Sequence, residues 1–192
     1  MKQLITDKLI IKEDKKYKLT SSGKDFANRL DVDSSITKIG KQAKVGVIIY
    51  AFMGRDSNSE IIAQTSLKEP FYGFIGAITG KIKFGETSFD TAKRELLEET
   101  GLRGDLSYHG VAHYIHIVNE EVAEDKFLFC FTAYNCIGEL IKEVPGMSHE
   151  LMSIADFRDS KNMHIGGLDI LDMSIGKSNK NFLEIIYYPE NF

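Results

Sequence analysis

Three glutamates stand close together in the segment that reads Arg94-Glu-Leu-Leu-Glu-Glu99. Glu95, Glu98 and Glu99 are spaced at i, i+3 and i+4, which places them side by side on one face of a helix. Like charges at this spacing destabilise a helix by roughly 0.2–0.5 kcal/mol per pair. A hard divalent cation such as Mg²⁺ takes oxygen ligands and would cancel the repulsion. The spacing would suit a metal site, but for such a run by itself a solvated acidic surface is the favoured interpretation.

The residues around these glutamates predict a helix with defined ends. Thr87 is in position to be the N-cap, and Asp90, three residues later, can complete a capping box. Gly101 follows the last residue of the pattern, where a left-handed C-terminal cap favours glycine. We therefore expect a helix from Ser88 to Thr100. The face next to the glutamates is expected to carry Phe89, Ala92, Lys93 and Leu96.

The wider segment 80–102 reads GKIKFGETSFDTAKRELLEETGL and matches a known signature. The signature is a glycine, five residues, a glutamate, seven residues and then R-E-U-x-E-E-x-G-U, where U is aliphatic. Its fixed positions are filled by Gly80, Glu86, Arg94, Glu95, Leu96, Glu98, Glu99, Gly101 and Leu102. A chance match over all of these positions is very improbable. The chain therefore resembles the Nudix hydrolase superfamily.

This resemblance implies a reaction and a cofactor. The reaction is hydrolysis of a nucleoside diphosphate linked to another group X, with Mg²⁺ (or Mn²⁺) as the cofactor and two phosphate-bearing products. Glu98 and Glu99 are implied as metal ligands, and Glu95 as a third ligand or as the base that orients water. Arg94 cannot be a base because guanidinium stays protonated. By analogy it pairs with Glu86 and aims the ligands, which completes a catalytic set of Glu95, Glu98 and Arg94.

The start of the signature raises two further expectations. Gly80 is expected to allow a backbone conformation that a side chain would forbid. Nudix proteins usually have a second glycine just before it and often use the carbonyl of that residue as a metal ligand. Here the residue is Thr79, and its carbonyl is expected to serve in the same way.

Candidates for substrate contacts lie outside the signature. Among the aromatic residues before it, Tyr72 and Phe74 are the ones expected to stack on a base, because core packing explains Tyr50 and Phe52 at least as well. His109, His113 and His116 alternate with apolar residues and are interpreted as core or surface histidines. Many Nudix enzymes add a downstream glutamate as base or ligand, and Glu143, beside Pro145-Gly146, has the best loop context. The other candidates are Glu120, Glu121, Glu124 and Glu150.

The substrate itself stays open at this point. Subfamilies that cleave ADP-ribose tend to carry a proline shortly after the signature, and residues 102–138 contain none. The block that marks NADH-cleaving members is also missing.

Composition narrows the class of protein. The chain has 192 residues, 43% of them hydrophobic and 27% charged, and a formal net charge of −4. No whole-protein basic field would draw it to nucleic acid or anionic membranes. No apolar run reaches the length of a membrane span, and charged residues occupy the N-terminus where a signal peptide needs an apolar core. We expect a cytoplasmic protein with a small-molecule nucleotide as its partner; a homodimer is common among relatives.

The chain order predicts an α/β fold in which a mixed sheet lies between helices, an α/β/α sandwich. Residues 42–192 are expected to form the Nudix domain. Strands are expected at 44–52, at 60–65 (returning antiparallel to the first), at 106–118, 126–134 and 182–188, and a second helix at 168–175.

Residues 1–41 are expected to be a separate extension with a linker. The segment 9–30 predicts two short strands and a helix and resembles the wing and following helix of a winged-helix domain. The hairpin is basic, with Lys12, Lys15, Lys16 and Lys18, but lysines on an exposed edge also prevent edge-to-edge pairing. Two hypotheses follow: a hydrolase, or a nucleotide-sensing transcriptional regulator that barely cleaves. The complete set of three glutamates favours the hydrolase.

Overall fold

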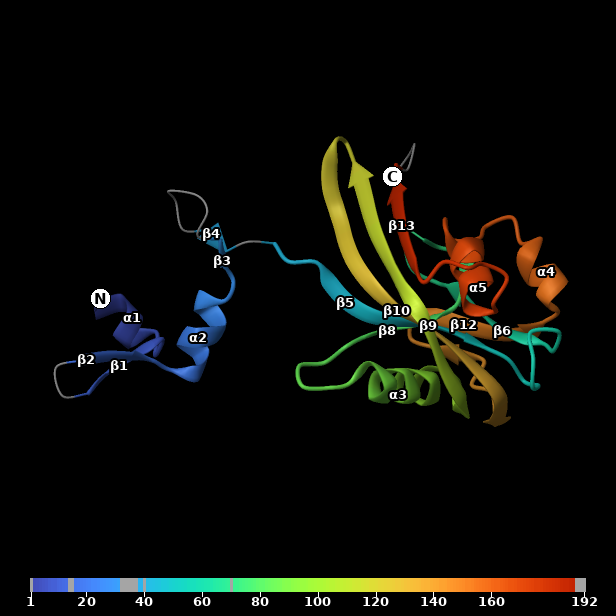
Figure 1. Ribbon diagram of the computed structural model, residues 1–192, viewed down its shortest axis with the longest axis horizontal. Coiled ribbons are helices and arrows are strands. Elements are labelled where there is room, and N and C mark those ends of the chain that lie inside the picture. Colours follow the sequence, from blue (N-terminus) through green and yellow to red (C-terminus); the bar gives the residue numbers. More distant parts are fainter. Residues whose placement is uncertain (1, 14–15, 32–37, 40, 70, 189–192) are drawn as a thin grey trace. The chain divides into compact units, whose positions relative to one another are not determined.

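The computed structural model describes residues 2–13, 16–31, 38–39, 41–69 and 71–188, and Figure 1 shows its elements. The chain divides into two compact units, Met1–Gln42 and Ala43–Phe192. No helix in the described part of the chain is long and apolar enough to cross a membrane.

The first unit has the hairpin and helix that its sequence predicts. Its elements are α1 (Lys2–Thr6), β1 (Ile10–Glu13), β2 (Lys16–Leu19), α2 (Ser21–Ala27), β3 (Leu30–Asp31) and β4 (Lys38–Ile39). Both strand pairs are antiparallel, and the Thr20 hydroxyl caps α2 by accepting the Gly23 N–H. Among its residues of described burial, only Ile10 and Gly23 are buried, so its core is minimal. Lys15 and most of the expected linker (32–37 and 40) lie outside the described residues.

The second unit is built on a mixed five-stranded sheet in the order β13-β9-β10-β5-β8. Neighbours β10–β5 and β13–β9 are parallel, whereas β9–β10 and β5–β8 are antiparallel. These strands are β5 (Lys44–Ala51), β8 (Ile78–Lys81), β9 (Leu102–Val118), β10 (Glu121–Gly138) and β13 (Phe182–Tyr187).

A second sheet takes up the strand that follows 44–52. The strand expected to return antiparallel is β6 (Ile61–Ser66), and among the described residues its β-bridge to the 44–52 segment is the antiparallel pair Phe52–Ile61. Both edges of β5 are already paired with β10 and β8, so β6 pairs elsewhere. The second sheet has the order β11-β12-β6-β7, with β11 (Glu143–Val144), β12 (Met147–Met152) and β7 (Ile75–Gly76).

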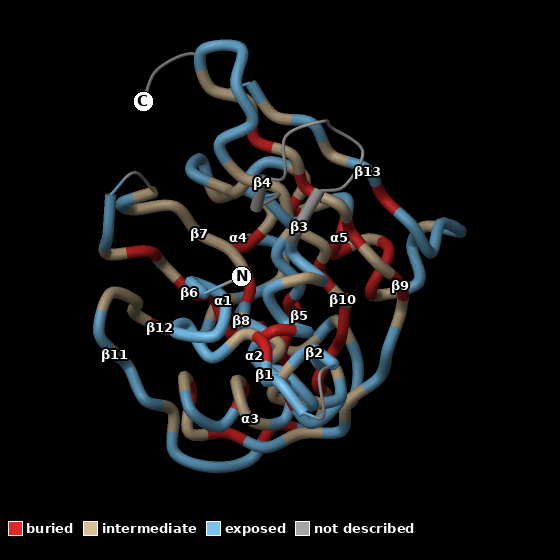
Figure 2. The backbone as a smooth tube through the Cα atoms, turned by 90° about the vertical axis from the view of Figure 1, so that its left-hand side faces the viewer, coloured by how far each residue is buried: buried red, intermediate tan, exposed pale blue. Residues whose placement is uncertain are grey.

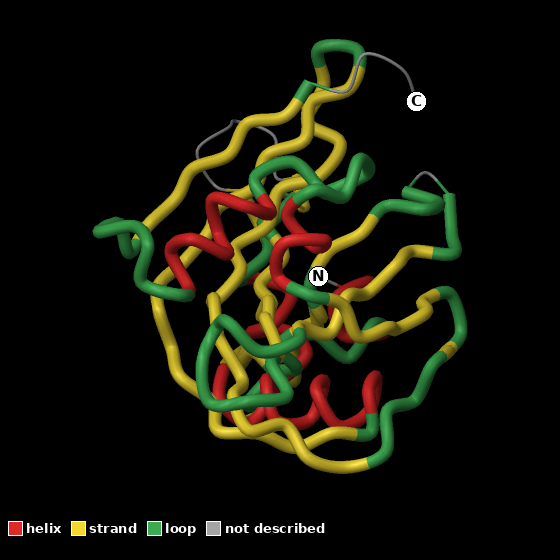
Figure 3. Tube along the Cα trace, turned by 90° about the vertical axis from the view of Figure 1, so that its right-hand side faces the viewer, coloured by secondary structure: helices red, strands yellow, loops and turns green. Residues whose placement is uncertain are grey.

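The two faces of β5 carry the two halves of the core. Val47, Ile49 and Ala51 pack in one cluster with residues of α3 (Ser88–Thr100). The alternate residues Ile48, Tyr50 and Phe52 pack in another with α4 (Ile154–Arg158) and α5 (Gly167–Ser174). Successive strand residues point to opposite faces, so a sheet buried on both sides reads as a continuous apolar run. The α/β/α sandwich is confirmed, as Figures 1 and 3 show, and Figure 2 shows the buried residues along its strands.

Helix α3 begins and ends where its sequence predicts. Thr87 accepts the Asp90 N–H at 3.1 Å, and its hydroxyl donates to the Asp90 carboxylate at 2.7 Å. Gly101 is left-handed, with φ 75°, and its N–H donates to the Leu97 carbonyl. These caps satisfy backbone groups that a helix end otherwise leaves unpaired, and they fix the position of the glutamates between them.

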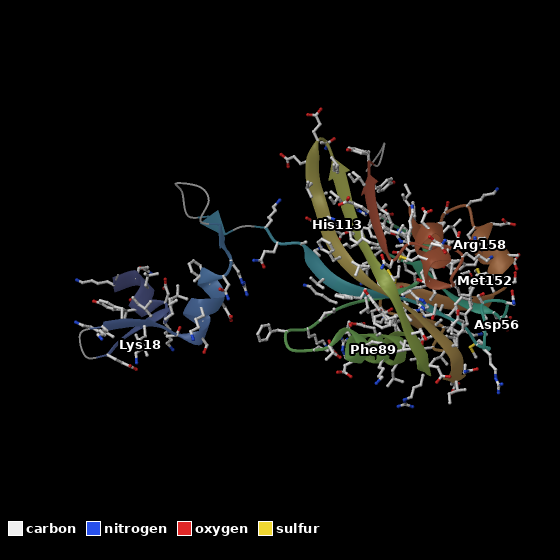
Figure 4. The ribbon with its side chains drawn as sticks, in the orientation of Figure 1. Lys18, Asp56, Phe89, His113, Met152 and Arg158 are labelled. Carbon is white, nitrogen blue, oxygen red and sulfur yellow. The ribbon has the colours of Figure 1, made fainter. Side chains whose placement is uncertain are left out.

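The core face of α3 differs in part from the expected one. Thr91, Ala92, Leu96 and Thr100 are buried. Phe89 is 43% exposed and contacts Phe131 only edge-on, at 4.9 Å between ring centroids; Figure 4 labels it on the helix. Lys93 is exposed. The packed stripe is therefore centred on Ala92 and Leu96, and the threonines fit within it because their hydroxyls donate to helix carbonyls.

Candidate functional site

Arg94 fastens the loop before α3 to the helix. Its Nε and Nη2 donate to the two oxygens of Glu86 at 2.7 and 2.9 Å, and Nη2 also donates to the Lys81 carbonyl at 3.2 Å. The bond from Arg94 is the main cause that lowers the pKa of Glu86 to about 2. This bidentate pair is the geometry in which arginine holds carboxylates most firmly. The two residues that the resemblance paired thus lie together.

The same guanidinium contacts two of the three helix glutamates. Arg94 Nη1 donates to Glu95 at 2.6 Å and to Glu98 at 3.1 Å. The Glu98 side chain is 57% exposed, so it is free to turn, whereas Glu95 is largely covered. Arg94 is therefore surrounded by carboxylates, and its own pKa is raised, chiefly by the bond with Glu86.

Gly80 is required for space rather than for an unusual backbone, which corrects the expectation. It lies in β8, and its φ is outside the left-handed region. A Cβ at this position would lie 2.0 Å from Cδ of Glu95, closer than any non-bonded contact allows. The Glu95 carboxylate thus lies against the backbone of Gly80. The residue before Gly80 is Thr79, whose carbonyl is the expected additional metal ligand.

Glu99 is half-buried, and its hydrogen-bond partner comes from β6. Its Oε2 accepts an N–H from Gln64 at 2.5 Å. Burial raises the pKa of Glu99, the Gln64 bond opposes this, and the charges of Glu95 and Glu98 add to the rise. Gln64 is 3.1 Å from Nε2 of His149. Neither Gln64 nor His149 was singled out from the sequence, although a glutamine inside the apolar strand Ile61–Ser66 predicts a buried polar group in need of a partner.

A cavity of about 270 Å³ begins beside these groups, on the α5 side of the sheet. Thr79 and Gln64 lie on its wall. Its lining also includes Ile48, Tyr50, Ser66, Phe71, Phe74, Gly76, Tyr114, His116, Glu124, Lys126, Leu128, His164 and Tyr187.

Aromatic rings form one wall of this cavity. The ring of His164 lies 5.1 Å from that of Phe71 and 5.3 Å from that of Phe74. Burial lowers the pKa of His164 to about 4, so the ring is neutral at neutral pH. Of the two expected base-stacking residues, Phe74 lines the cavity, whereas Tyr72 is 63% exposed and does not. Phe71 and His164 were missed because a loop sequence does not reveal which of its rings turns inward.

Of the downstream glutamates, only Glu124 is among the cavity-lining residues. Lys126 and Lys44 donate to it at 3.0 and 3.1 Å; burial opposes them, but their net effect is to lower the pKa of Glu124. Cys130, Ile48 and Thr79 are level with one another on the adjacent strands β10, β5 and β8. Glu124 precedes Cys130 by six residues along β10, which is roughly 20 Å at about 3.3 Å per residue. Glu124 therefore lies at the end of the cavity far from Thr79.

The other candidates lie elsewhere. Glu143 is exposed in β11, and Glu150 is exposed in β12. His109 bonds the Thr132 hydroxyl, and His113 stacks on Phe127 at 4.0 Å. His116, by contrast, lines the cavity.

The acidic residues fit a hard divalent cation by their chemistry. Four carboxylates (Glu86, Glu95, Glu98 and Glu99) and one guanidinium leave a formal charge of −3, and carboxylate oxygens are the ligands that Mg²⁺ prefers. Within the described residues, no three His, Cys, Asp or Glu side chains converge on a common point where an ion fits. Arg94 holds Glu95 and Glu98, and Gln64 holds Glu99. A cation would need Arg94 to release the first two.

Comparisons with known proteins identify the family of the chain. A family model described as the NUDIX domain matches residues 40–170. No curated protein matches the chain.

Three solved structures illustrate the shared fold. A mutator MutT protein from Bacillus halodurans is 22% identical, covers 77% of this chain and 92% of its own, and has a TM-score of 0.59. The NUDIX domain of Shewanella oneidensis NrtR, solved with ADP ribose, is 16% identical over 81% of this chain and 96% of its own, with a TM-score of 0.59. A MutT NUDIX hydrolase from Burkholderia pseudomallei is 20% identical, covers 69% of this chain and 98% of its own, and has a TM-score of 0.57. With well over half of its length matched by the family model, the chain belongs to the Nudix family.

Proposed function

We propose that this Nudix pyrophosphohydrolase uses Mg²⁺ (or Mn²⁺) to cleave the diphosphate of a nucleoside diphosphate linked to another moiety X. The observation that carries the proposal is the group of Glu95, Glu98 and Glu99 on α3, of which Glu99 accepts a hydrogen bond from Gln64 on the cavity wall. A bound divalent cation supplies positive charge for phosphate oxygens and lowers the pKa of water. Residues 42–192 form the hydrolase domain in this proposal, and residues 1–41 are an accessory extension.

The roles of the residues follow from their positions. Glu98 and Glu99 hold the cation, with the Thr79 carbonyl as a further ligand. Glu95, fixed against Gly80, is the third ligand or the group that accepts a proton from the attacking water. Arg94 keeps the loop and the glutamates in register through Glu86, since it stays protonated and cannot accept a proton.

The proposal also includes an orientation of the substrate in the cavity. The diphosphate belongs at the end near Thr79 and Gln64, beside the glutamates. The rest of the molecule extends along the apolar and aromatic wall, where Phe74 and its neighbours offer a surface for a ring. An apolar cavity with a few polar groups is typical of nucleotide-sized ligands.

A second candidate is a nucleotide-sensing regulator. The basic hairpin and helix of the first unit favour it, as does the resemblance to the Nudix domain of NrtR, which was solved with ADP ribose. In this alternative the cavity binds a nucleotide without efficient cleavage.

A substrate panel separates the two functions. The protein is incubated with Mg²⁺ and with ADP-ribose, NADH, dinucleoside polyphosphates, sugar nucleotides or nucleoside triphosphates, and phosphate products are measured. A hydrolase releases products from at least one compound, and Glu98→Gln and Glu99→Gln abolish the release. The matched control is Glu60→Gln, which alters an exposed glutamate before β6 and should leave turnover intact. Tight nucleotide or DNA binding without any turnover would instead support the regulator.

A further inference from the structure

Two buried polar side chains near Glu99, Gln64 and His149, have no role in the proposed reaction. Gln64 is 5% exposed and His149 is 4% exposed, and they are opposite each other in the antiparallel pairing of β6 and β12. A buried polar group left without a hydrogen bond destabilises the folded state. The bonds that these two side chains make therefore define what they do.

The hydrogen bonds fix the direction of each donor. His149 Nδ1 lies 2.9 Å from the Ile141 carbonyl, which can only accept, so the ring proton is on Nδ1. Burial lowers the pKa of His149 and keeps the ring neutral, so its Nε2 accepts from Gln64 at 3.1 Å. The second N–H of the same amide donates to Glu99. The opposite orientation of the amide, which would point its oxygen at a carboxylate, is thereby excluded.

Ile141, which accepts the hydrogen bond from His149, also contacts the C-terminal end of α3 and so links the network back to the helix that carries Glu99. The Ile141 N–H donates to the Thr100 carbonyl at 2.9 Å, and the Ile141 side chain would lie 3.1 Å from a Cβ at Gly101. Ile141 thus binds both the last turn of the helix and His149. The closed circuit from Glu99 through Gln64, His149 and Ile141 back to α3 sets the distance between the helix and the second sheet.

We propose that Gln64 and His149 are positioning residues for Glu99, an inference that rests on the metal-ligand role of Glu99 in the proposed function. Gln64 occupies Oε2 of Glu99, and His149 holds the amide so that its N–H faces the carboxylate. Among the described residues Glu99 accepts no other side-chain hydrogen bond, so Oε1 is left to face a cation. Groups that orient metal ligands typically change metal affinity or activity 10–100-fold when removed.

Direct binding of Mn²⁺, followed by electron paramagnetic resonance without any substrate, tests this role. Gln64→Leu keeps the size and removes the donor, and His149→Phe keeps a ring and removes the acceptor. Each is expected to weaken Mn²⁺ binding roughly 10–100-fold. His149→Gln, whose amide oxygen can accept where Nε2 did, should recover part of the loss. Thr65→Val, on the same strand and outside the network, is the matched control and should bind Mn²⁺ like the wild type.

A double-mutant cycle distinguishes positioning from a general effect on the fold. If Gln64 acts through Glu99, then Gln64→Leu added to Glu99→Gln causes no further loss of Mn²⁺ affinity. Urea unfolding without metal establishes that each variant is folded. If Gln64→Leu does not fold, Gln64→Asn, which draws the amide back by one methylene, is measured in its place with the same expectation.

The outcomes separate this inference from the proposed function. A wild-type protein that binds no Mn²⁺, or a Glu99→Gln variant that binds it normally, overturns the proposed function. Normal Mn²⁺ binding by folded Gln64→Leu overturns only the positioning role. A raised KM with unchanged Mn²⁺ affinity also overturns it, because Gln64 would then be a substrate contact on the cavity wall.

Discussion

At the scale of single residues, Arg94 is where the loop, the helix and the glutamates meet. It binds Glu86 with two hydrogen bonds and Glu95 and Glu98 with one each. The bond to Glu86 is bidentate and is therefore the more directional one. A cation that displaces Nη1 from Glu95 and Glu98 would leave the Glu86 bonds in place, so the loop stays fastened while the ligands turn.

The contribution of the Arg94–Glu86 pair to stability should depend on pH, and replacing Glu86 should show this. The fold lowers the pKa of Glu86 from 4.5 to about 2. A carboxylate with a lowered pKa contributes stability that is present above its ordinary pKa and is lost as pH falls through the lowered one. The wild type should be more stable than Glu86→Gln at pH 7, and the difference should shrink between about pH 4.5 and pH 2. Urea unfolding at several pH values measures it; a constant difference would contradict the assignment.

Gly80→Ala should separate activity from folding. The added methyl group collides with the far end of a flexible side chain, Glu95, which can move aside. The fold should therefore persist while turnover falls, by roughly 10²-fold, since displacement of a reacting group by about 1 Å has that effect. The check is steady-state kinetics beside thermal unfolding. Lys81→Ala, which alters an exposed neighbour, is the control; equal losses in both variants would refute the space argument.

At the scale of elements, what is local could be predicted from the sequence. The bounds of α3 depend on Thr87, Asp90 and Gly101, which lie at its own ends, so the prediction was confirmed. The pairing of β6 depends on which strands already occupy the edges of β5, and no neighbouring residue encodes that choice. The prediction that 60–65 returns antiparallel to 44–52 holds at the Phe52–Ile61 bridge, whereas the rest of β6 pairs with β12 and β7 for this reason.

The residues of the candidate site likewise fall into a group that local sequence predicts and a group that depends on tertiary packing. The residues of the signature are near one another in the chain, so their grouping could be predicted. Gln64 and His149 come from different strands, 85 residues apart, and meet only through the second sheet. Phe71 and His164 are similarly distant in sequence, and their place on the cavity wall depends on tertiary packing.

Two glycines with the same positive φ permit a test of the α3 cap. Gly101 and Gly176 both have φ 75°. A Cβ at Gly176 meets nothing within 4 Å, whereas at Gly101 it would lie 2.5 Å from the Glu139 carbonyl. Gly176→Ala should cost about 1–2 kcal/mol through backbone strain alone, and Gly101→Ala should cost more. Chemical denaturation gives both values; equal losses would mean that packing around the cap contributes nothing.

At the scale of the whole molecule, the two units differ in how much core they have. Both core clusters are built from residues of the second unit, whereas the described part of the first buries little. A unit with its own hydrophobic core on both faces of a sheet is expected to fold alone.

Removal of residues 1–42 should therefore leave a folded, active protein. We expect residues 43–192 to unfold in a single cooperative transition and to keep the kcat and KM of the full chain on any substrate found with the panel. Calorimetry and kinetics on both proteins make the comparison. A large loss of turnover in a folded 43–192 would assign the extension a part in the reaction.

The segment 75–81 passes from one sheet to the other, with β7 in the second sheet and β8 in the first. Its later half places Thr79 and Gly80 under the glutamates, on a strand held by β5. Its earlier half follows the loop that carries Phe71 and Phe74 to the cavity wall. In the proposed function, the stretch that holds the metal site and the stretch that contacts the substrate are thus consecutive in the chain and anchored to different sheets. A substitution in the loop that carries Phe71 and Phe74 could therefore change which substrate binds without moving Thr79, Gly80 or the glutamates.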